Sequence, residues 1–288
     1  NVSILLDENF KINYIKKIIK KYKPNYIFAQ KRFFSKFNRT NKVVSGKEFF
    51  LLKTNYKKYN KINKKNLLLL STSGTTQNPK FVRLSNLNLI NNTNSIIEYL
   101  KINSKHTTIT TLPMAYSYGL SILNTHLQSG ASIIVNNKTM FDRSFWKIFK
   151  KYQITSFGGV TQFYEQLKKL DFERMNFPSL KYITQAGGKM ENDTLKYFGE
   201  ICRKKKIKMI IMYGQTEASP RMSYLEWKNF FSKLGSIGKA LKGSRFNIID
   251  SKGKNINKPD AVGELIFYGK NVCLGYANYV NDLSKGDM

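Results

Sequence analysis

The chain has 288 residues, 41% of them hydrophobic, and a formal net charge of +31. Its 17 tyrosines and 20 phenylalanines exclude a chain that is disordered throughout. No apolar run approaches the roughly 20 residues that a helix needs to cross a bilayer, so we expect no membrane span. The length allows one large domain or two ordinary ones.

The positive charge has two interpretations. It could mark a polyanionic partner, either nucleic acid or an anionic membrane surface. It could also reflect composition, because Lys, Asn and Ile are abundant together and the lysines are spread along the chain. The densest run, residues 11–23, has isoleucines at helical spacing and a lysine face. We therefore expect a solvated basic surface without a specific nucleic-acid partner, although a positive field would favour a nucleotide substrate.

The two cysteines, Cys202 and Cys273, are far apart in the sequence. Without a secretory leader, this usage fits a reducing cytoplasm better than a disulfide framework, and we expect a cytoplasmic protein. The first residue is Asn1, so we expect the chain to begin inside a longer reading frame.

Strand and helix patterns alternate along most of the chain. A helix over 11–23 is stopped by Pro24, a strand follows at 26–29, and 30–66 is expected to be loops with a short helix. The remaining predicted helices are 85–100, with Ser85 as N-cap, 119–130, 143–153, 161–170 and 193–205. The remaining predicted strands are 66–72, 107–113 and 131–136, together with 154–160, 180–188 and 208–218, each of which includes the turn or loop that follows its strand.

This alternation predicts an α/β fold with mostly parallel sheets flanked by helices. After Gly235 the helical patterns stop, and short strands at 245–250 and 263–269 predict a small β-rich subdomain. We therefore expect an α/β core over 1–234, with two sheet subdomains, and the start of the β-rich subdomain over 235–288.

Three unusual loops follow apolar strands, at 71–80, 185–190 and 213–217. In α/β sheets, ligands bind beyond the carboxyl ends of the strands. We expect these loops to converge on one crevice.

The first loop reads "STSGTTQNPK" and follows four leucines. Its consecutive hydroxyls, its Gly-loosened backbone and Lys80 suit a polyphosphate, which needs several donors around it. It is not a Walker A loop, because Lys80 is followed by Phe81. A polar surface linker is the alternative, and the buried strand directly before the loop disfavours it.

The third loop lies in "MYGQTEASPRMSY", residues 212–224. Tyr213 offers a flat face for a purine, and Gly214 permits close approach of the backbone. Thr216 offers a hydroxyl to phosphate, and Glu217 offers a carboxylate to Mg²⁺.

These motifs resemble those of the adenylate-forming superfamily, which comprises acyl-CoA synthetases, peptide-synthetase adenylation domains and luciferases. Residues 72–80 match its phosphate-binding signature, [ST]-S-G-[ST]-T-G-x-P-K, except that Gln77 stands where the family usually has Gly. If the loop needs a positive φ there, Gln77 adds strain. The resemblance implies a set of phosphate-binding residues, with Lys80 also catalytic: Thr72, Ser73, Gly74, Thr75, Thr76 and Lys80.

The second signature of the superfamily, Tyr-Gly-x-Thr-Glu, resembles residues 213–217. It implies that Thr216 and Glu217 are catalytic and hold the phosphates and the magnesium ion, beside Tyr213, Gly214 and Gln215. The stretch "TQAGGKM", 184–190, resembles the turn that lies against adenine. This adds three nucleotide-binding residues, Ala186, Gly187 and Gly188.

The segment 112–134 resembles the part of the family that helps to form the acyl pocket, which implies pocket roles for Tyr116, Tyr118 and Gly119. The alternative is that both tyrosines belong to the core. Neither His106 nor His126 has a partner pattern for a metal or a catalytic triad, so we expect both to be structural.

The resemblance covers nearly the whole chain in the family's order. It implies that ATP and Mg²⁺ activate a small carboxylic acid as an acyl-adenylate. The acceptor would be a thiol of CoA or of the phosphopantetheine arm of an acyl carrier protein. Asp287 lies too close to Tyr276 to be the family's ribose-binding Asp. We therefore expect that Asp, and a small C-terminal domain with a catalytic lysine, beyond Met288.

Alone, this chain is then expected to adenylate poorly. Two alternatives stay open at this point. One is an inactive nucleotide-binding fragment, and the other is a charge-driven binder of nucleic acid or membrane surfaces.

Overall fold

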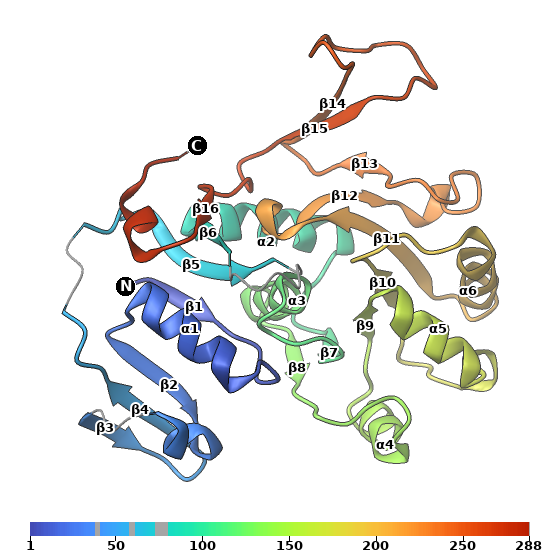
Figure 1. The fold of residues 1–288 in the computed structure, drawn as a ribbon. Coiled ribbons are helices and arrows are strands. Elements are labelled where there is room, and N and C mark those ends of the chain that lie inside the picture. The colour runs from blue at the N-terminus through green and yellow to red at the C-terminus, as the bar shows by residue number, and fades with distance from the viewer. Residues whose placement is uncertain (38–40, 58–60, 73–79, 288) are drawn as a thin grey trace. The chain divides into compact units, whose positions relative to one another are not determined.

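The structure, a computed structural model, describes residues 1–37, 41–57, 61–72 and 80–287. The chain divides into two compact units (Figure 1). The first unit joins Asn1–Leu84 to Leu274–Met288, and the second unit is Ser85–Cys273. The boundary that the sequence suggests at residue 235 falls inside the second unit, and the division into 1–234 and 235–288 stays a prediction.

The first unit contains two small sheets and helix α1 (Ile12–Tyr22). One sheet has the order β1 (Ser3–Leu5), β5 (Asn66–Ser71), β6 (Phe81–Ser85) and β16 (Tyr276–Ala277). The other has the order β2 (Tyr26–Gln30), β4 (Phe49–Lys53) and β3 (Asn41–Ser45). Short 3₁₀ helices cover Lys31–Lys36 and Val280–Ser284. Strands β1 and β5 are parallel, whereas β16 runs antiparallel to β6.

Residues from both ends of the chain form the core of the first unit. Ile18 and Tyr22 of α1 pack with Leu69 and Phe81, and the Tyr22 hydroxyl donates to the carbonyl oxygen of Ala277 at 2.8 Å. Buried Arg83 donates from its guanidinium to the carbonyl oxygens of Leu274, Lys285 and Gly286. This side chain therefore ties the C-terminal segment to β6.

The prediction for residues 30–66 is correct for the short helix, which is present at Lys31–Lys36, but it missed the strands β3 and β4. Phe50 and Leu52 of β4 are buried on one face, with 1% and 2% of their surface exposed, while Phe49 and Lys53 are exposed. The alternation is only five residues long and lies within a Lys- and Asn-rich stretch. Pairing with β2 and β3 makes it a strand.

The second unit is built on a seven-stranded sheet of order β13-β12-β11-β10-β9-β7-β8. The strands β8, β7, β9, β10 and β11 are parallel, and β12 and β13 are antiparallel. In chain order their bounds are Thr107–Ile109 (β7), Ser132–Ile134 (β8), Ser156–Gly159 (β9), Tyr182–Gln185 (β10), Lys208–Gly214 (β11), Arg221–Leu225 (β12) and Lys239–Ala240 (β13). This arrangement confirms the predicted α/β fold.

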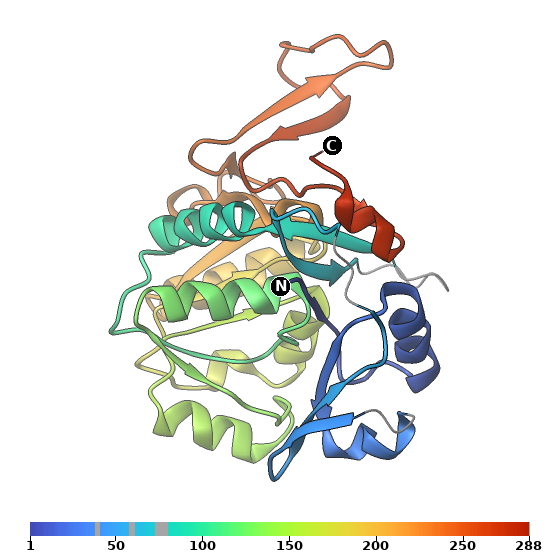
Figure 2. The same ribbon diagram turned by 90° about the vertical axis from the view of Figure 1, so that its left-hand side faces the viewer.

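Helices cover both faces of this sheet (Figures 1 and 2). Their bounds are Asn86–Leu100 (α2), Ser117–Gln128 (α3), Arg143–Lys151 (α4), Thr161–Lys169 (α5) and Asn192–Lys204 (α6), with 3₁₀ turns at Phe172–Arg174 (η2), Thr216–Ala218 (η3) and Trp227–Asn229 (η4). Each predicted helix after residue 85 is present, with ends that differ by at most two residues. Ser85 caps α2 as predicted, because its hydroxyl accepts from the Asn88 backbone N–H at 3.1 Å.

The two faces of the sheet have different cores. Phe157, Ile183 and Met209 face α4, α5 and α6 in a large aromatic cluster. The adjacent residues Ile210 and Met212 point to the opposite face, where they pack with side chains of α2 and α3. Since side chains alternate along a strand, each strand contributes to both layers.

The predicted β-rich region is a hairpin. Strands β14 (Arg245–Ile249) and β15 (Glu264–Tyr268) pair antiparallel and project from the rest of the second unit (Figure 1). A helix long and apolar enough to cross a membrane is not found in the part of the chain that the structure describes.

The substitution Phe198→Ala tests the aromatic layer. Phe198 is fully buried, and its ring packs edge-on against Tyr164 with centroids 5.2 Å apart. We expect a loss of about 3–5 kcal/mol in the free energy of unfolding, because the cavity cannot be refilled. Urea denaturation followed by tryptophan fluorescence measures this, since Trp146 and Trp227 both pack against this layer. Lys196→Ala, an exposed change in the same helix, should shift stability by less than about 0.5 kcal/mol. Equal losses in both variants would contradict this packing.

Candidate active site

Three parallel strands of the second unit, β9, β10 and β11, end at the same edge of the sheet, and β11 extends past the other two to Gly214. Gly159 at the end of β9 pairs with Gln185 at the end of β10, and Gln185 pairs with Ile211 of β11. The predicted loops 185–190 and 213–217 therefore leave neighbouring strands at the same sheet edge. The segment 116–119 also lies in the second unit, at the start of α3. Ligands bind at such edges in α/β folds.

The predicted phosphate loop is described only at its two ends. Ser73, Gly74, Thr75 and Thr76 lie outside the described residues, as does Gln77. Thr72 is half-buried directly after β5 in the first unit.

Lys80 is exposed at the other end of the phosphate loop, next to β6. Its Nζ lies 3.3 Å from the centroid of the Tyr276 ring, also in the first unit. This cation–π contact gives the lysine a defined position.

The turn after β10 requires glycine at Gly187 for two reasons. Its φ is +83°, and a Cβ atom there would lie 2.8 Å from the hydroxyl oxygen of Tyr116. Gln185 is buried and holds the turn, because its Nε2 donates to the carbonyl oxygen of Gly188 at 2.8 Å. Ala186 is buried and Gly188 is exposed. The glycine pair therefore lets Tyr116 lie directly against this turn.

The loop after β11 brings two backbone segments into contact. A Cβ atom on Gly214 would collide with the carbonyl oxygen of Pro220, and the Gln215 N–H donates to that same oxygen at 2.8 Å. Tyr213 just before the loop is 38% exposed, so part of its ring is available to a ligand. Gln215 is exposed as well.

Thr216 and Glu217 lie in the 3₁₀ turn η3 that follows. Thr216 is 8% exposed, and its Oγ1 lies 3.1 Å from Oγ of Ser117 at the start of α3. Glu217 is half-buried, and its carbonyl oxygen accepts from the Cys273 N–H at 2.8 Å. Sequence reasoning missed Ser117, although it stands between the two tyrosines that were singled out.

The two tyrosines occupy different environments. Tyr116 is half-buried, whereas Tyr118 is buried and its hydroxyl pairs with the Thr184 hydroxyl at 2.7 Å. Burial raises the pKa of Tyr118 to about 12, against a smaller lowering by Arg221. Gly119 is needed because a Cβ atom there would collide with the carbonyl oxygen of Pro113. Tyr118 thus belongs to the core and also lines a pocket.

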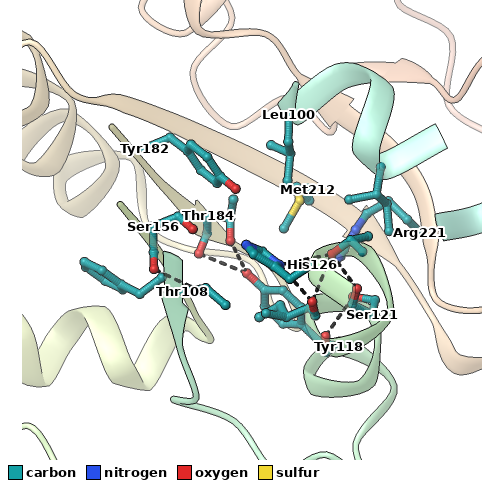
Figure 3. Close-up of a pocket in the computed structure, with 15 residues that line it drawn as sticks. Leu100, Thr108, Tyr118, Ser121, His126, Ser156, Tyr182, Thr184, Met212 and Arg221 are labelled. Atoms are coloured by element: carbon teal, nitrogen blue, oxygen red, sulfur yellow. Dashed lines mark hydrogen bonds between the residues drawn. The ribbon is translucent and has the colours of Figure 1, made fainter. Parts of the chain in front are cut away.

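This pocket lies between α2, α3 and the sheet (Figure 3). The space open to the centres of water-sized molecules is about 20 Å³, which is room for about one water. Its lining residues are Ile96, Leu100, Thr108, Tyr118, Ser121, Ile122, Thr125, His126, Ser156, Phe157, Gly158, Tyr182, Thr184, Met212 and Arg221. We call it the inner pocket.

Both histidines are buried and contact nearby backbone. His126 Nδ1 lies 2.9 Å from the Ile122 carbonyl oxygen, and burial lowers the pKa of His126 to about 4. The ring is therefore neutral at pH 7, with Nδ1–H as donor and Nε2 as acceptor. His106 Nδ1 lies 3.3 Å from the Asn103 carbonyl oxygen, and burial lowers its pKa as well. These contacts fit the structural roles predicted from the sequence.

The described residues do not include a group of three or more His, Cys, Asp or Glu side chains that could hold a metal. Magnesium in nucleotide sites is usually held by one or two carboxylates together with substrate phosphates. The single carboxylate of Glu217, next in the chain to Thr216, fits a site in which magnesium is held by one carboxylate together with substrate phosphates.

Comparison with known proteins identifies the family. The family model described as AMP-binding enzyme matches residues 4–277. The chain belongs to the AMP-binding enzyme family. Among curated relatives, the oxalate–CoA ligase of Arabidopsis thaliana is 29% identical over 216 residues, covering 73% of this chain and 41% of that protein. The 2-succinylbenzoate–CoA ligase of Enterococcus faecalis is 29% identical over 212 residues, covering 73% of this chain and 42% of that protein.

Solved structures show the same fold. The o-succinylbenzoate CoA synthetase of Bacillus subtilis with the acyl-adenylate intermediate OSB-AMP has a TM-score of 0.73 and 20% identity, covering 95% of this chain and 70% of that one. Its complex with ATP and a magnesium ion has a TM-score of 0.72 and 20% identity, covering 95% and 56%. This chain spans about two-fifths of the length of the curated relatives named above.

The neutral state of His126 predicts a pH dependence of stability. The unfolded state takes up a proton below its pKa near 6.5, whereas the folded state does so only near 4. Stability should therefore be complete above pH 6.5 and fall by up to ~3 kcal/mol as the pH drops to 4. Urea denaturation at several pH values measures this. His126→Gln should flatten the curve more than His106→Gln. A curve that keeps its slope in His126→Gln would contradict this origin.

The contact between Gly214 and Pro220 predicts a steric effect. Gly214→Ala should lower the free energy of unfolding by about 1–3 kcal/mol, because a backbone carbonyl must move to admit the methyl group. Gly46→Ala is the control, since its nearest neighbour would be the Phe49 carbonyl oxygen at 3.8 Å. Thermal unfolding compares the two. A stable Gly214→Ala protein would mean that the loop has room that the structure does not show.

Proposed function

We propose that this chain forms the nucleotide- and acid-binding part of a ligase that activates a carboxylic acid as its acyl-adenylate. The observation that carries this proposal is the placement of the Gly187 turn, with Tyr116 against it, beside the loop that holds Thr216 and Glu217. Family membership and the CoA ligases among the relatives support it. The solved structure with an acyl-adenylate shares the fold.

The nucleotide would use the edge of the sheet. We assign the adenine to the turn of Ala186, Gly187 and Gly188, with the exposed part of the Tyr213 ring as a second flat surface. Gly214 and Gln215 would bring backbone close to the nucleotide. This assignment uses groups that lie at the ends of adjacent strands.

The phosphates would lie near Thr216 and Glu217. The Ser117 hydroxyl fixes the Thr216 side chain, which reduces the entropy lost when it meets a phosphate. Glu217 would hold Mg²⁺, which when bound offsets the charge that develops on the phosphates. For the first unit, considered by itself, we keep the prediction from the loop signature that Lys80 acts as a cation, and Thr72 and residues 73–76 as donors, to a phosphate.

The acid would enter from the side of Tyr116, with Tyr118 and Gly119 shaping its pocket. In the reaction a carboxylate oxygen bonds to the α-phosphorus of ATP, and the bond to pyrophosphate breaks. The chain's own task is to orient the two anions against each other and keep water away. Transfer to a thiol is proposed for the whole protein.

CoA is the thiol acceptor that the relatives' names favour, with the phosphopantetheine arm of an acyl carrier protein as the further possibility. The two cysteines, Cys202 and Cys273, are far apart in the sequence, and we keep the prediction of a cytoplasmic location.

Glu217→Gln tests the assignment of the metal ligand. We expect the affinity for ATP with Mg²⁺ to fall about tenfold or more, and the affinity for AMP to change less than about twofold. Isothermal titration calorimetry with this chain measures both. Glu165→Gln, an exposed carboxylate on α5, is the matched control and should bind like the wild type. Equal losses for ATP and AMP would contradict a metal role, and carboxylate-dependent ATP–pyrophosphate exchange by the whole protein tests the reaction itself.

A further inference from the structure

The inner pocket contains a buried cation. Arg221 begins β12 and is 2% exposed. Its backbone is fixed on both sides, because its carbonyl oxygen accepts from Asn92 Nδ2 at 2.8 Å and from Asn271 Nδ2 at 2.7 Å. Its N–H donates to Asn92 Oδ1 at 3.3 Å. The position of this arginine is therefore built into the fold.

Arg221 has aromatic rather than acidic neighbours. The guanidinium carbon lies 4.7 Å from the centroid of the Tyr118 ring. It also lowers the pKa of Tyr99, in part through a side-chain hydrogen bond, and that of Tyr116, although burial raises the pKa of each tyrosine more strongly. These tyrosines are therefore neutral at pH 7. No carboxylate within the described ranges makes an ion pair with Arg221, and its Nε has no hydrogen-bond partner there.

A guanidinium cannot lose its charge at any physiological pH. Its removal from water costs several kcal/mol unless an anion or a set of acceptors replaces the lost hydration. The Tyr118 ring recovers part of this as a cation–π contact. An anionic group of a ligand would recover more, and the buried arginine would then contribute to affinity.

The remaining polar groups of the pocket do not provide that anion. His126 Nε2, Ser156 Oγ and Tyr182 Oη are buried and lack a hydrogen-bond partner among the described residues. All three line the same pocket as Arg221 (Figure 3). His126 Nε2 is an acceptor, and the two hydroxyls can donate or accept. Of the lining residues, Arg221 is the charged one, so it alone distinguishes an anionic ligand from a neutral one.

We propose that the acid activated at this site carries a second anionic group, such as a second carboxylate, and that Arg221 binds that group. The proposal rests on the proposed function, because it takes the inner pocket as the continuation of the acid site beyond Tyr118. Because the open space of the pocket holds about one water, the second anionic group would have to be small, and lining side chains would have to move to admit it.

The experiment uses stable mimics of the acyl-adenylate, in which a sulfamate replaces the phosphate. One mimic carries a succinyl group, which ends in a carboxylate, and the other carries a butanoyl group of the same chain length, which ends in a methyl. AMP is the third ligand. Calorimetry with this chain gives three dissociation constants and does not require turnover.

We expect the wild-type chain to bind the succinyl mimic at least tenfold more tightly than the butanoyl mimic. Arg221→Met should abolish this preference while the affinity for AMP stays within about twofold. Arg221→Lys keeps the charge without the fork of donors and should retain part of the preference. Arg245→Met is the matched control, because Arg245 lies 4.6 Å from the centroid of the Tyr268 ring at an exposed site.

The outcomes separate the two proposals. Binding of AMP and equal affinities for the two mimics would overturn the inference and leave the proposed function standing. A parallel loss for AMP and both mimics in Arg221→Met would also overturn it, since Arg221 would then act on the nucleotide. Failure of the wild-type chain to bind AMP or either mimic would overturn the proposed function itself. If Arg221→Met does not fold, the wild-type preference and Arg221→Lys decide.

Discussion

Two buried amides hold the part of the chain on which the candidate site depends. The side chains of Asn92 and Asn271 both donate to the carbonyl oxygens of Ala218 and Arg221, at 2.6–3.2 Å. These four hydrogen bonds join α2 and the segment before Cys273 to the turn between β11 and β12. The turn carries Thr216 and Glu217, and its end carries Arg221. Each carbonyl oxygen accepts from both amides, so loss of one amide removes two of the four hydrogen bonds, and only loss of both would leave these buried carbonyls without the amides, at a cost of about 1–3 kcal/mol each.

The same four hydrogen bonds hold both the residues that we assign to the nucleotide and the residue that we assign to the acid. Thr216 and Glu217 face the nucleotide side in our assignment, whereas Arg221 faces the inner pocket. A rigid turn keeps the separation between them constant, so the distance between the phosphate and the far end of the acid would be set by the backbone. Preorganisation of this kind limits the entropy lost on binding.

The positively charged side chains of the protein fall into an exposed group and a buried group. Most lysines are exposed, and exposed ion pairs such as that of Lys242 with Glu98 contribute little to stability. Arg83 and Arg221 differ from these lysines because both arginines are buried. Arg83 is satisfied by backbone carbonyl oxygens, which makes it structural. Arg221 faces a pocket, which makes it a candidate for recognition.

The sequence by itself determined the α/β class, the helices of the second unit and the loops after β10 and β11, because each depends on local periodicity, capping or turn chemistry. It did not reveal β3 and β4, whose short apolar alternation becomes a strand only through pairing. Strand β12 was missed for the same reason, and Arg221 with it. Tertiary structure decided which side chains meet: Ser117 with Thr216, Tyr116 with Gly187, and Arg221 with Tyr118. Such contacts join residues that are about 70 to 100 positions apart, and local sequence patterns do not encode them.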